Sequence, residues 1–230
     1  MFKKDKSLIE IWTAIEGLAG IEECKPQPAS KFIPEWWKNA PYVNDPGVLR
    51  TVKVCPSFPD MFSQGYIIPA WCDMILNGGD NPGFTLPSDQ FKLSFHTHKQ
   101  FLDYVPKHYR DTVDVIIKAH MPWRIKTPKG YSVYQMPLFF HYNEDYSIVP
   151  GIINTDSHHI VNPQIVLHTK KPKVVIKRGD PLVWYIPFKR EKFNLEVREE
   201  TEDDRYIDTI HHMNIFSKFT DGYKKGIGNG

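Results

Sequence analysis

The sequence predicts a mainly β protein, with a jelly-roll-like fold or a distorted β-barrel or sandwich. Two observations favour this class. The 230 residues include 19 prolines, which helix interiors and central strands exclude, so short elements joined by ordered turns are expected. Between residues 121 and 188, short apolar runs alternate with turn signals at close spacing, a pattern typical of sandwiches and barrels.

The length fits a single domain over residues 1–230. Within it we expect a proline- and tryptophan-rich N-terminal cap at 1–50 and a β core at 51–198. A C-terminal helix is expected at 199–222, followed by a loose tail at 223–230.

The N-terminal cap contains short helical turns. Residues 8–21 fit either a strand or a short helix. Pro34–Lys38 predicts one helical turn, because proline suits the first helical position and Glu35 complements the helix dipole. Trp36 and Trp37 in this turn either cap one end of the core or form an aromatic platform for a ligand.

Short runs of β-branched and aromatic residues predict the strands of the core. They are expected at 51–54, 66–71, 91–98, 113–118, 131–140, 148–153, 160–168, 173–176 and 182–187. Three connections carry strong turn signals, Asn77–Gly83, Thr127–Gly130 and Lys177–Asp180. The second has proline at its second position and glycine at its fourth, which predicts a type I hairpin turn.

The hydrophobic period changes near the C-terminus. Thr201–Asp204 resembles a capping box, with a hydroxyl followed three places later by a carboxylate. The apolar residues that follow recur at helical spacing, which predicts one amphipathic helix over 202–219, packed on the β core. They are Tyr206, Ile207, Ile210, Met213 and Phe216. An exchange of this helix between protomers is one route to a homo-oligomer, and the sequence leaves the oligomeric state open.

Composition argues against several classes of protein. The net charge is +2 and the lysines are densest at the two termini, so no nucleic-acid partner is expected. Cys24, Cys55 and Cys72 are odd in number and lack C-x-x-C spacing, which argues against a disulfide framework or zinc ribbon and favours a reducing cytoplasm. A secretory signal and a membrane-spanning run are not expected.

Five short motifs stand out along the chain: Pro34–Lys38, Cys55–Asp60, Thr127–Ser132, Gly151–Asp156 and Ile186–Glu191. Together they resemble an uncharacterised family carried by T4-like phages of marine bacteria. The resemblance spans roughly residues 8 to 220 and implies a phage origin and a place in the host cytoplasm, with association with the virion as the alternative. Two of the motifs, Thr-Pro-x-Gly-Tyr and Gly-Ile-x-x-Thr-Asp, also resemble a group of uncharacterised bacterial proteins.

A second similarity is to the β-barrel of trimeric dUTP pyrophosphatases. Gly151–Asp156 is similar to the segment that binds the deoxynucleoside in that family, and Gly179-Asp180 is similar to its later Gly-Asp pair. The chain lacks the family's glycine-rich C-terminal phosphate arm and a clear serine-rich phosphate motif. We interpret the similarity as a shared architecture and not as a shared activity.

The histidines suggest a centre for a divalent transition metal. His96 and His98 would point to one face of a strand, because strand side chains alternate. Asp156, His158 and His159 lie in one connection and would add a carboxylate and a third imidazole, leaving positions open for substrate or water. In the alternative interpretation the histidines are solvated strand and loop residues, and Asp156 holds a turn through backbone N–H groups.

Four aromatic residues are candidates for the lining of a ligand pocket. They are Trp123, Tyr131, Tyr134 and Trp184, and the alternative is that they belong to the core. Small molecules do bind in the mouths of barrels and sandwiches.

No specific catalytic motif is present, so an enzymatic activity stays open. The first functional hypothesis is a phage-encoded protein that binds a metal or small ligand and has an auxiliary enzymatic activity. The alternative is a non-catalytic protein used in phage assembly or in binding a host factor.

Overall fold

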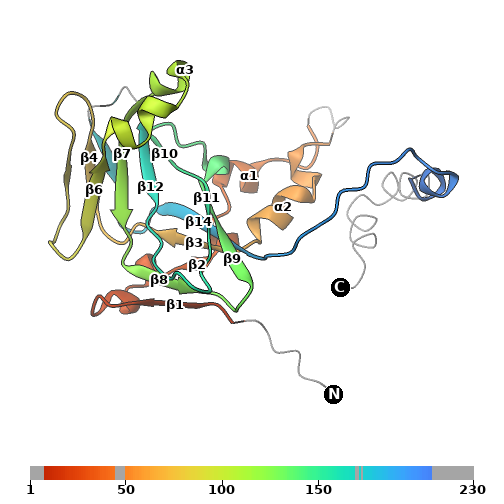
Figure 1. The fold of residues 1–230 in the computed structure, drawn as a ribbon, viewed down its shortest axis with the longest axis horizontal. Helices are drawn as coiled ribbons and strands as arrows, with labels where there is room; N and C mark the ends of the chain where they lie inside the picture. The colour runs from red at the N-terminus through yellow and green to blue at the C-terminus, as the bar shows by residue number, and fades with distance from the viewer. Residues whose placement is uncertain (1–7, 45–49, 169–170, 172, 209–230) are drawn as a thin grey trace. The chain divides into compact units, whose positions relative to one another are not determined.

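The computed structural model describes residues 8–44, 50–168, 171 and 173–208, and its elements are shown in Figure 1. The fold is mainly β, as predicted, and is built from antiparallel sheets. None of the described sheets closes into a barrel. Of the predicted alternatives, a closed barrel is therefore excluded for the described residues.

The elements are short. The strands are β1 Glu10–Thr13, β2 Gln27–Pro28, β3 Tyr66–Pro69, β4 Met74–Asn77, β5 Gly83–Thr85, β6 Lys92–His96, β7 Val113–His120, β8 Trp123–Lys126, β9 Tyr131–Met136, β10 Tyr146–Ile148, β11 Gly151–Ile153, β12 Gln164–His168, β13 Val174–Ile176 and β14 Pro181–Lys189. The α-helices are α1 Glu35–Asn39, α2 Ser57–Phe62 and α3 Lys107–Arg110. The 3-10 helices are η1 Leu18–Gly20, η2 Glu22–Cys24, η3 Ala29–Phe32, η4 Val52–Val54, η5 His98–Gln100, η6 Leu102–Tyr104 and η7 Phe139–His141.

The strands form four sheets, with the orders β1-β8, β10-β12-β7-β6, β11-β9-β14-β3-β2 and β13-β4-β5. The long strand β14 lies at the centre of the largest sheet, between β9 and β3. The longest strand of the second sheet, β7, pairs with β12 and β6. Two central strands thus organise most of the β structure.

Two of the predicted turns, Asn77–Gly83 and Thr127–Gly130, differ in how well they match the structure. Asn77–Gly83 does connect a hairpin, because β4 pairs with β5 and Asn77 lies opposite Gly83. The turn after β8 is not the expected type I hairpin turn. It runs from Pro128 to Tyr131, whose N–H donates to the Pro128 carbonyl at 3.0 Å, and Gly130 at its third position has φ +86°, as a type II turn requires. Since β8 pairs with β1 and β9 with β14, the turn joins two sheets.

Several expected strands also differ from the structure, and three of them differ for a clear physical reason or at a clear position. In place of the strand expected at 51–54, residues 52–54 form η4, because the Thr51 hydroxyl accepts the Lys53 N–H at 3.1 Å and starts a helical turn. The strand expected at 148–153 is split between β10 and β11, which lie in different sheets on either side of Pro150. The strand expected at 91–98 ends at His96.

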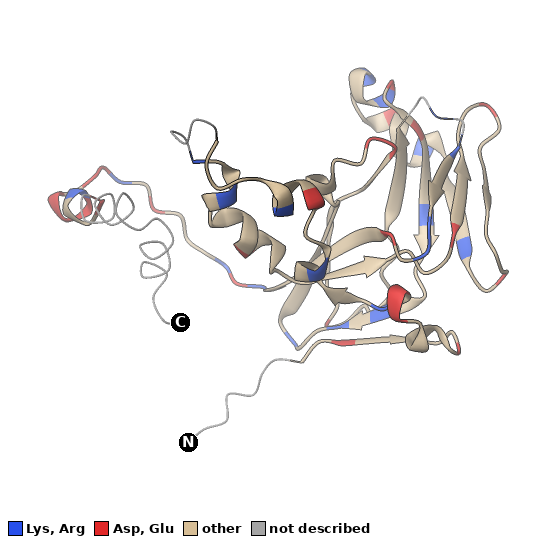
Figure 2. Ribbon diagram, turned by 180° about the vertical axis from the view of Figure 1, so that it is seen from behind, with Lys and Arg blue, Asp and Glu red and all other residues tan. Residues whose placement is uncertain are grey.

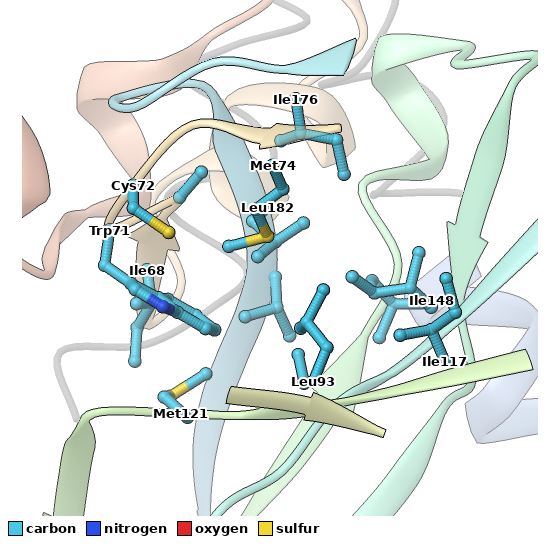
Figure 3. Packing of buried hydrophobic residues seen from close by; sticks show 14 of the residues in the cluster. Ile68, Trp71, Cys72, Met74, Leu93, Ile117, Met121, Ile148, Ile176 and Leu182 are labelled. Atoms are coloured by element: carbon cyan, nitrogen blue, oxygen red, sulfur yellow. The ribbon is translucent and has the colours of Figure 1, made fainter. Parts of the chain in front are cut away.

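The sheets enclose one large hydrophobic cluster, part of which is shown in Figure 3. Ile148 of β10 lies near Ile117 of β7, and Met74 of β4 lies near Leu182 of β14 (Figure 3). Ile117 and Met74 are both completely buried. The cluster therefore ties together strands from different sheets, and burial of this apolar surface is the main driving force for the fold.

The chain divides into two compact units. The first unit comprises Met1–Phe32 and Gln64–Arg190 and holds all four sheets, and the second comprises Ile33–Ser63 and Glu191–Gly230. In the second unit, Trp36 contacts Phe58 of α2 with ring centroids 6.2 Å apart, and Trp37 contacts Phe62 at 5.4 Å. The predicted helical turn at Pro34–Lys38 is confirmed as α1.

The C-terminal helix is described only at its beginning. Residues 202–208 are helical. The capping box is confirmed, because the Asp204 N–H donates to the Thr201 hydroxyl at 3.3 Å and the Thr201 N–H donates to the Asp204 carboxylate at 2.8 Å. Tyr206 is 68% exposed and Ile207 50% exposed, so the described turn does not pack on a core as expected. Ile210, Met213 and Phe216 lie outside the described residues.

Charges of both signs are interspersed along the described strands and connections (Figure 2). Among the described helices, none has the length and apolar character needed to cross a bilayer.

Candidate functional site

The predicted metal ligands lie in separate places. His96 ends β6 opposite Ile116 of β7, and its Nε2 is buried without a hydrogen-bond partner in the described part of the chain. His98 begins the 3-10 helix η5. The alternation that would have put both imidazoles on one strand face therefore stops before His98.

The acidic connection lies beside a different strand. The carbonyl of His159 accepts the Ile125 N–H of β8 at 3.0 Å, and its ring contacts Trp12 with centroids 5.6 Å apart. β8 follows the His120 end of β7, whereas Ile116 is four residues earlier in β7, a separation of about 13 Å along a strand. His96 and His159 consequently lie on different parts of the sheet structure.

The structure therefore does not bring His96, His98, Asp156, His158 and His159 together as one set of metal ligands. Within the described residues, which include all five, no group of three or more His, Cys, Asp or Glu side chains is placed to hold a metal ion. The physical reason is that the histidine strand ends early and the acidic connection packs against another sheet.

Asp156 instead holds a turn, which was the alternative interpretation. Its carboxylate accepts the Gly130 N–H at 2.9 Å and pairs with the Arg190 guanidinium, which donates to Oδ1 at 2.9 Å and also to Oδ2. The hydrogen bond from Arg190, followed by that from Gly130, lowers the pKa of Asp156 to about 2. The carboxylate is therefore ionised at neutral pH and committed to structure.

Neighbouring buried polar groups extend this turn. The hydroxyls of Thr127 and Thr155 lie 2.8 Å apart, and both residues are almost completely buried. Arg190 also donates to the Ser132 hydroxyl at 2.9 Å, and that hydroxyl donates to the Asn154 side chain at 2.7 Å. The motifs Thr-Pro-x-Gly-Tyr and Gly-Ile-x-x-Thr-Asp are thus two halves of one hydrogen-bonded joint between sheets.

The four predicted pocket aromatics do not form a common pocket. Trp123 and Trp184 are each only 3% exposed, and the Trp184 indole N–H donates to the Gln64 carbonyl at 2.7 Å. Tyr134 stacks on Phe188 on an outer sheet face, with ring centroids 4.2 Å apart. None of these four aromatic residues lines either of the two cavities described below. They fit better as residues that pack in the core or on the surface, which was the alternative interpretation.

The cysteines are free thiols. Burial raises the pKa of Cys72 to about 12, and burial also raises the pKa of Cys24. Because the thiolate is the nucleophile, these two side chains are unreactive at neutral pH.

A cavity beside the connection from β9 to β10, which we call the large cavity, has a volume of about 800 Å³. Its lining comes from three parts of the chain: residues 137–139 and 141–148, Lys171, and residues 180–182. Ile148 and Leu182 are almost completely buried and join this cavity to the hydrophobic core. The volume is in the range of small-molecule sites.

Local hydrogen bonds give the connection its shape. The Asn143 side-chain carbonyl accepts the N–H groups of Asp145 at 2.9 Å and Tyr146 at 3.2 Å, an Asx turn that leads into β10. Tyr142, just before it, has φ +50° and is the one residue other than glycine with a positive φ in the described chain. Such a conformation is costly for a bulky side chain and occurs preferentially at functional sites.

The cavity is acidic. Glu144, Asp145 and Asp180 face one cation, Lys171, whose ammonium group is already paired with Asp145 at 2.5 Å. Burial lowers the pKa of His141, against an opposing hydrogen bond to the Phe32 carbonyl, so this imidazole is neutral at pH 7. The lining therefore carries two more negative than positive charges.

Aromatic rings line the same space. Phe139 is 40% exposed and Tyr142 67% exposed. Burial, followed by the negative charge of Asp180, raises the pKa of Tyr146 to about 12, against a side-chain hydrogen bond with Asn143. The Tyr146 phenol is thus an O–H group at neutral pH, and an aromatic, acidic surface of this kind attracts cations.

A second cavity of about 530 Å³ lies beside η1 and the turn after β13. There Arg178 pairs with Glu23 at 2.9 Å, and its backbone N–H donates to Asp73 at 2.8 Å. These hydrogen bonds hold the turn that leads into β14, so we interpret this site as structural.

The sequence-based interpretation missed the residues of the large cavity. The run Phe139–Tyr146 combines four aromatic residues with two carboxylates and a histidine, and this composition was the available signal. Lys171 and Asp180 reach the cavity only through the tertiary structure, so the sequence around them does not indicate that they line it.

Comparison with known proteins gives structural matches alone. No family model matches the chain, and no curated protein matches it. A mutant dUTPase from phage phi11 of S. aureus matches with 11% identity and a TM-score of 0.40, over 85% of this chain and 99% of the other. A mutant dUTPase of Staphylococcus bacteriophage 80alpha, solved with dUpNHpp, matches with 9% identity and a TM-score of 0.40, over 86% of this chain and all of the other. At these values the likeness supports no conclusion about activity or ligand.

Proposed function

We propose that this protein binds a small organic cation in the cavity beside the β9–β10 connection. The observation that carries the proposal is the combination of three carboxylates with aromatic rings around a space of about 800 Å³. An ammonium or guanidinium group would gain from both the carboxylates and the ring faces. The apolar floor formed by Ile148 and Leu182 would accept the ligand's hydrocarbon part.

The proposal is tested by titrating the full chain with choline and spermidine as cationic probes and AMP as an anionic probe. We expect binding of at least one cation and weaker binding of AMP. Tighter binding of AMP, or no heat of binding with either cation at millimolar concentration, would refute it.

Two charge variants sharpen the test. Glu144→Gln removes an exposed negative charge and should weaken cation binding about two- to five-fold, whereas Lys171→Met removes the cation from Asp145 and should strengthen it by a similar factor. Lys129→Met, at a residue outside the cavity lining, serves as the matched control and should leave the affinity unchanged. Effects of the same sign for Glu144→Gln and Lys171→Met would show that charge does not govern binding.

The resemblance to the family of T4-like phages supports a further proposal, that the protein is made during infection and acts in the host cytoplasm. Mass spectrometry of purified virions tests this. Stoichiometric recovery in the particles would instead favour the assembly role.

A further inference from the structure

A segment after β14 exposes three large apolar side chains. Residues 191–200 form neither helix nor strand and are drawn in Figure 1 as an extended blue ribbon. Within them Phe193 is 86% exposed, Leu195 89% and Val197 85%. In an extended chain, residues two apart point to the same side, so these three form one apolar strip. We call residues 191–198 the apolar arm.

The apolar arm has the pattern of a strand that lacks a sheet. Alternation of apolar with polar residues is typical of a strand with one buried face. Exposed apolar strips of this kind mark interaction sites in stable proteins.

The largest sheet has a matching open edge. β11 is its first strand and pairs with β9 on one side, and no described strand pairs with its other side. β11 consists of Gly151, Ile152 and Ile153 and has no charged residue. Sheet edges are usually protected by charges, prolines or bulges, and this edge has none of them among its own residues.

An apolar row leads to this edge. Ile186 of β14 lies opposite Tyr134 of β9, and Tyr134 lies opposite Ile152 of β11. The exposed fraction is 39% at Tyr134 and 58% at Ile152. A further strand beside β11 would continue the row with its own apolar side chain.

We infer that the apolar arm of a second copy of this chain adds as a strand to the free edge of β11, with Leu195 beside Ile152. Leu195 would continue the apolar row of Ile186, Tyr134 and Ile152 on the added strand, and each copy carries both the arm and the row. A reciprocal exchange makes the contact twice and closes the assembly. The added strand would also satisfy the open backbone groups of β11.

The arm's own sequence disfavours pairing with the same copy. Arg190 is held by Asp156 and by the Gly130 carbonyl, so the root of the arm is fixed. A return to β11 from this root needs a tight reversal before Leu195. Residues 191–200 contain no glycine or proline, and Asn194 is their one residue of a type that favours turns.

The oligomeric state tests the inference directly. By light scattering on the full chain at micromolar concentrations, we expect a mass above that of one 26.8 kDa chain. Ile152→Lys and Leu195→Lys should each raise the dissociation constant at least ten-fold with unchanged circular dichroism. Val175→Lys, at a 50% exposed position on the edge strand β13 of another sheet, and Asn194→Ser should leave it unchanged. A monomeric wild-type chain, or oligomers that both lysine variants preserve, would overturn the inference.

Cross-linking identifies the contact. Separately purified Ile152→Cys and Leu195→Cys proteins are mixed and oxidised, with each protein alone as the control for the native thiols. We expect a disulfide-linked heterodimer that forms in the mixture at several times the level in either control. Absence of this excess, or a disulfide within one chain as the main product of the double variant, would show that the arm does not reach a second copy.

Discussion

Asp156 illustrates what one carboxylate does for the joint between two sheets. Its folded-state pKa is about 2, below its ordinary value of 3.8. A group with a lowered pKa contributes stability above its unfolded pKa and loses that contribution as the pH falls through the folded value. The contribution should therefore be complete at neutral pH and disappear between about pH 4 and pH 2.

We predict that Asp156→Asn lowers the urea midpoint at pH 7 and that the deficit relative to wild type shrinks as the pH approaches about 3. Asp103→Asn, at an exposed residue of η6, is the control and should show little deficit at either pH. A deficit for Asp156→Asn that is the same at both pH values would show that the ion pair with Arg190 is not its cause.

Tyr142 carries strain at the large cavity. Asparagine adopts the left-handed conformation more readily than tyrosine. We predict that Tyr142→Asn raises the free energy of unfolding by up to about 1 kcal/mol and weakens choline binding. Tyr104→Asn, at an 81% exposed tyrosine without a positive φ, should do neither. If Tyr142→Asn were less stable than wild type and bound choline equally well, the backbone conformation of Tyr142 would be neither strained nor needed for binding.

At the scale of elements, the approach of β3 to β14 depends on one glycine. A Cβ on Gly65 would lie 2.1 Å from the Tyr185 carbonyl oxygen and 2.9 Å from the Ile186 Cα, and φ is +65°. Both neighbours are backbone atoms of β14, so they cannot move without disturbing the pairing with β3 and β9. We predict that Gly65→Ala lowers the free energy of unfolding by more than about 2 kcal/mol.

The matched control is Gly20→Ala. Nothing lies within 4 Å of a Cβ at Gly20, and its φ is not positive. Its effect in the same urea titration should stay within about 0.5 kcal/mol. Equal effects of the two substitutions would contradict the close approach.

Strand existence was easier to predict than strand partners. The run of β-branched residues at 113–118 predicted the strand that is now β7, and the glycine-rich segment Asn77–Gly83 correctly predicted a turn, because both signals are local. Thr127–Gly130 was assigned to a hairpin wrongly, since the partners of β8 and β9 lie elsewhere in the chain. Residues 51–54 have strand-forming composition, but the Thr51 cap favours a helical turn.

For the whole molecule, the sequence identified the correct fold class but not the candidate site. The metal hypothesis required the histidine-bearing strand β6 to lie beside the connection that holds Asp156, His158 and His159. The order of strands in the sheets keeps these two segments apart. The large cavity joins residues 137–139 and 141–148 to Lys171 and Asp180, a combination fixed by which strands share sheets. The joint at Asp156 was anticipated as a turn, although its partner Arg190 was not.

Susceptibility to protease should report the state of the apolar arm in the whole molecule. Proteases bind their substrates as extended chains, and exposed segments without secondary structure are their preferred sites. Lys192 lies in the arm beside Phe193 and is exposed, whereas Arg198 is paired with Asp204. We predict that trypsin cuts a dilute solution of the native protein early after Lys192.

Addition of the arm to β11 of a second copy would remove this site from the protease. Cleavage after Lys192 should therefore slow about ten-fold at concentrations above the dissociation constant of the oligomer, because only the free fraction is cut. The Ile152→Lys variant should be cut at the same rate at low and high concentration. Peptide mapping of the new C-terminus measures both rates, and a wild-type rate that does not depend on concentration would mean that the arm stays exposed in every assembly the protein forms.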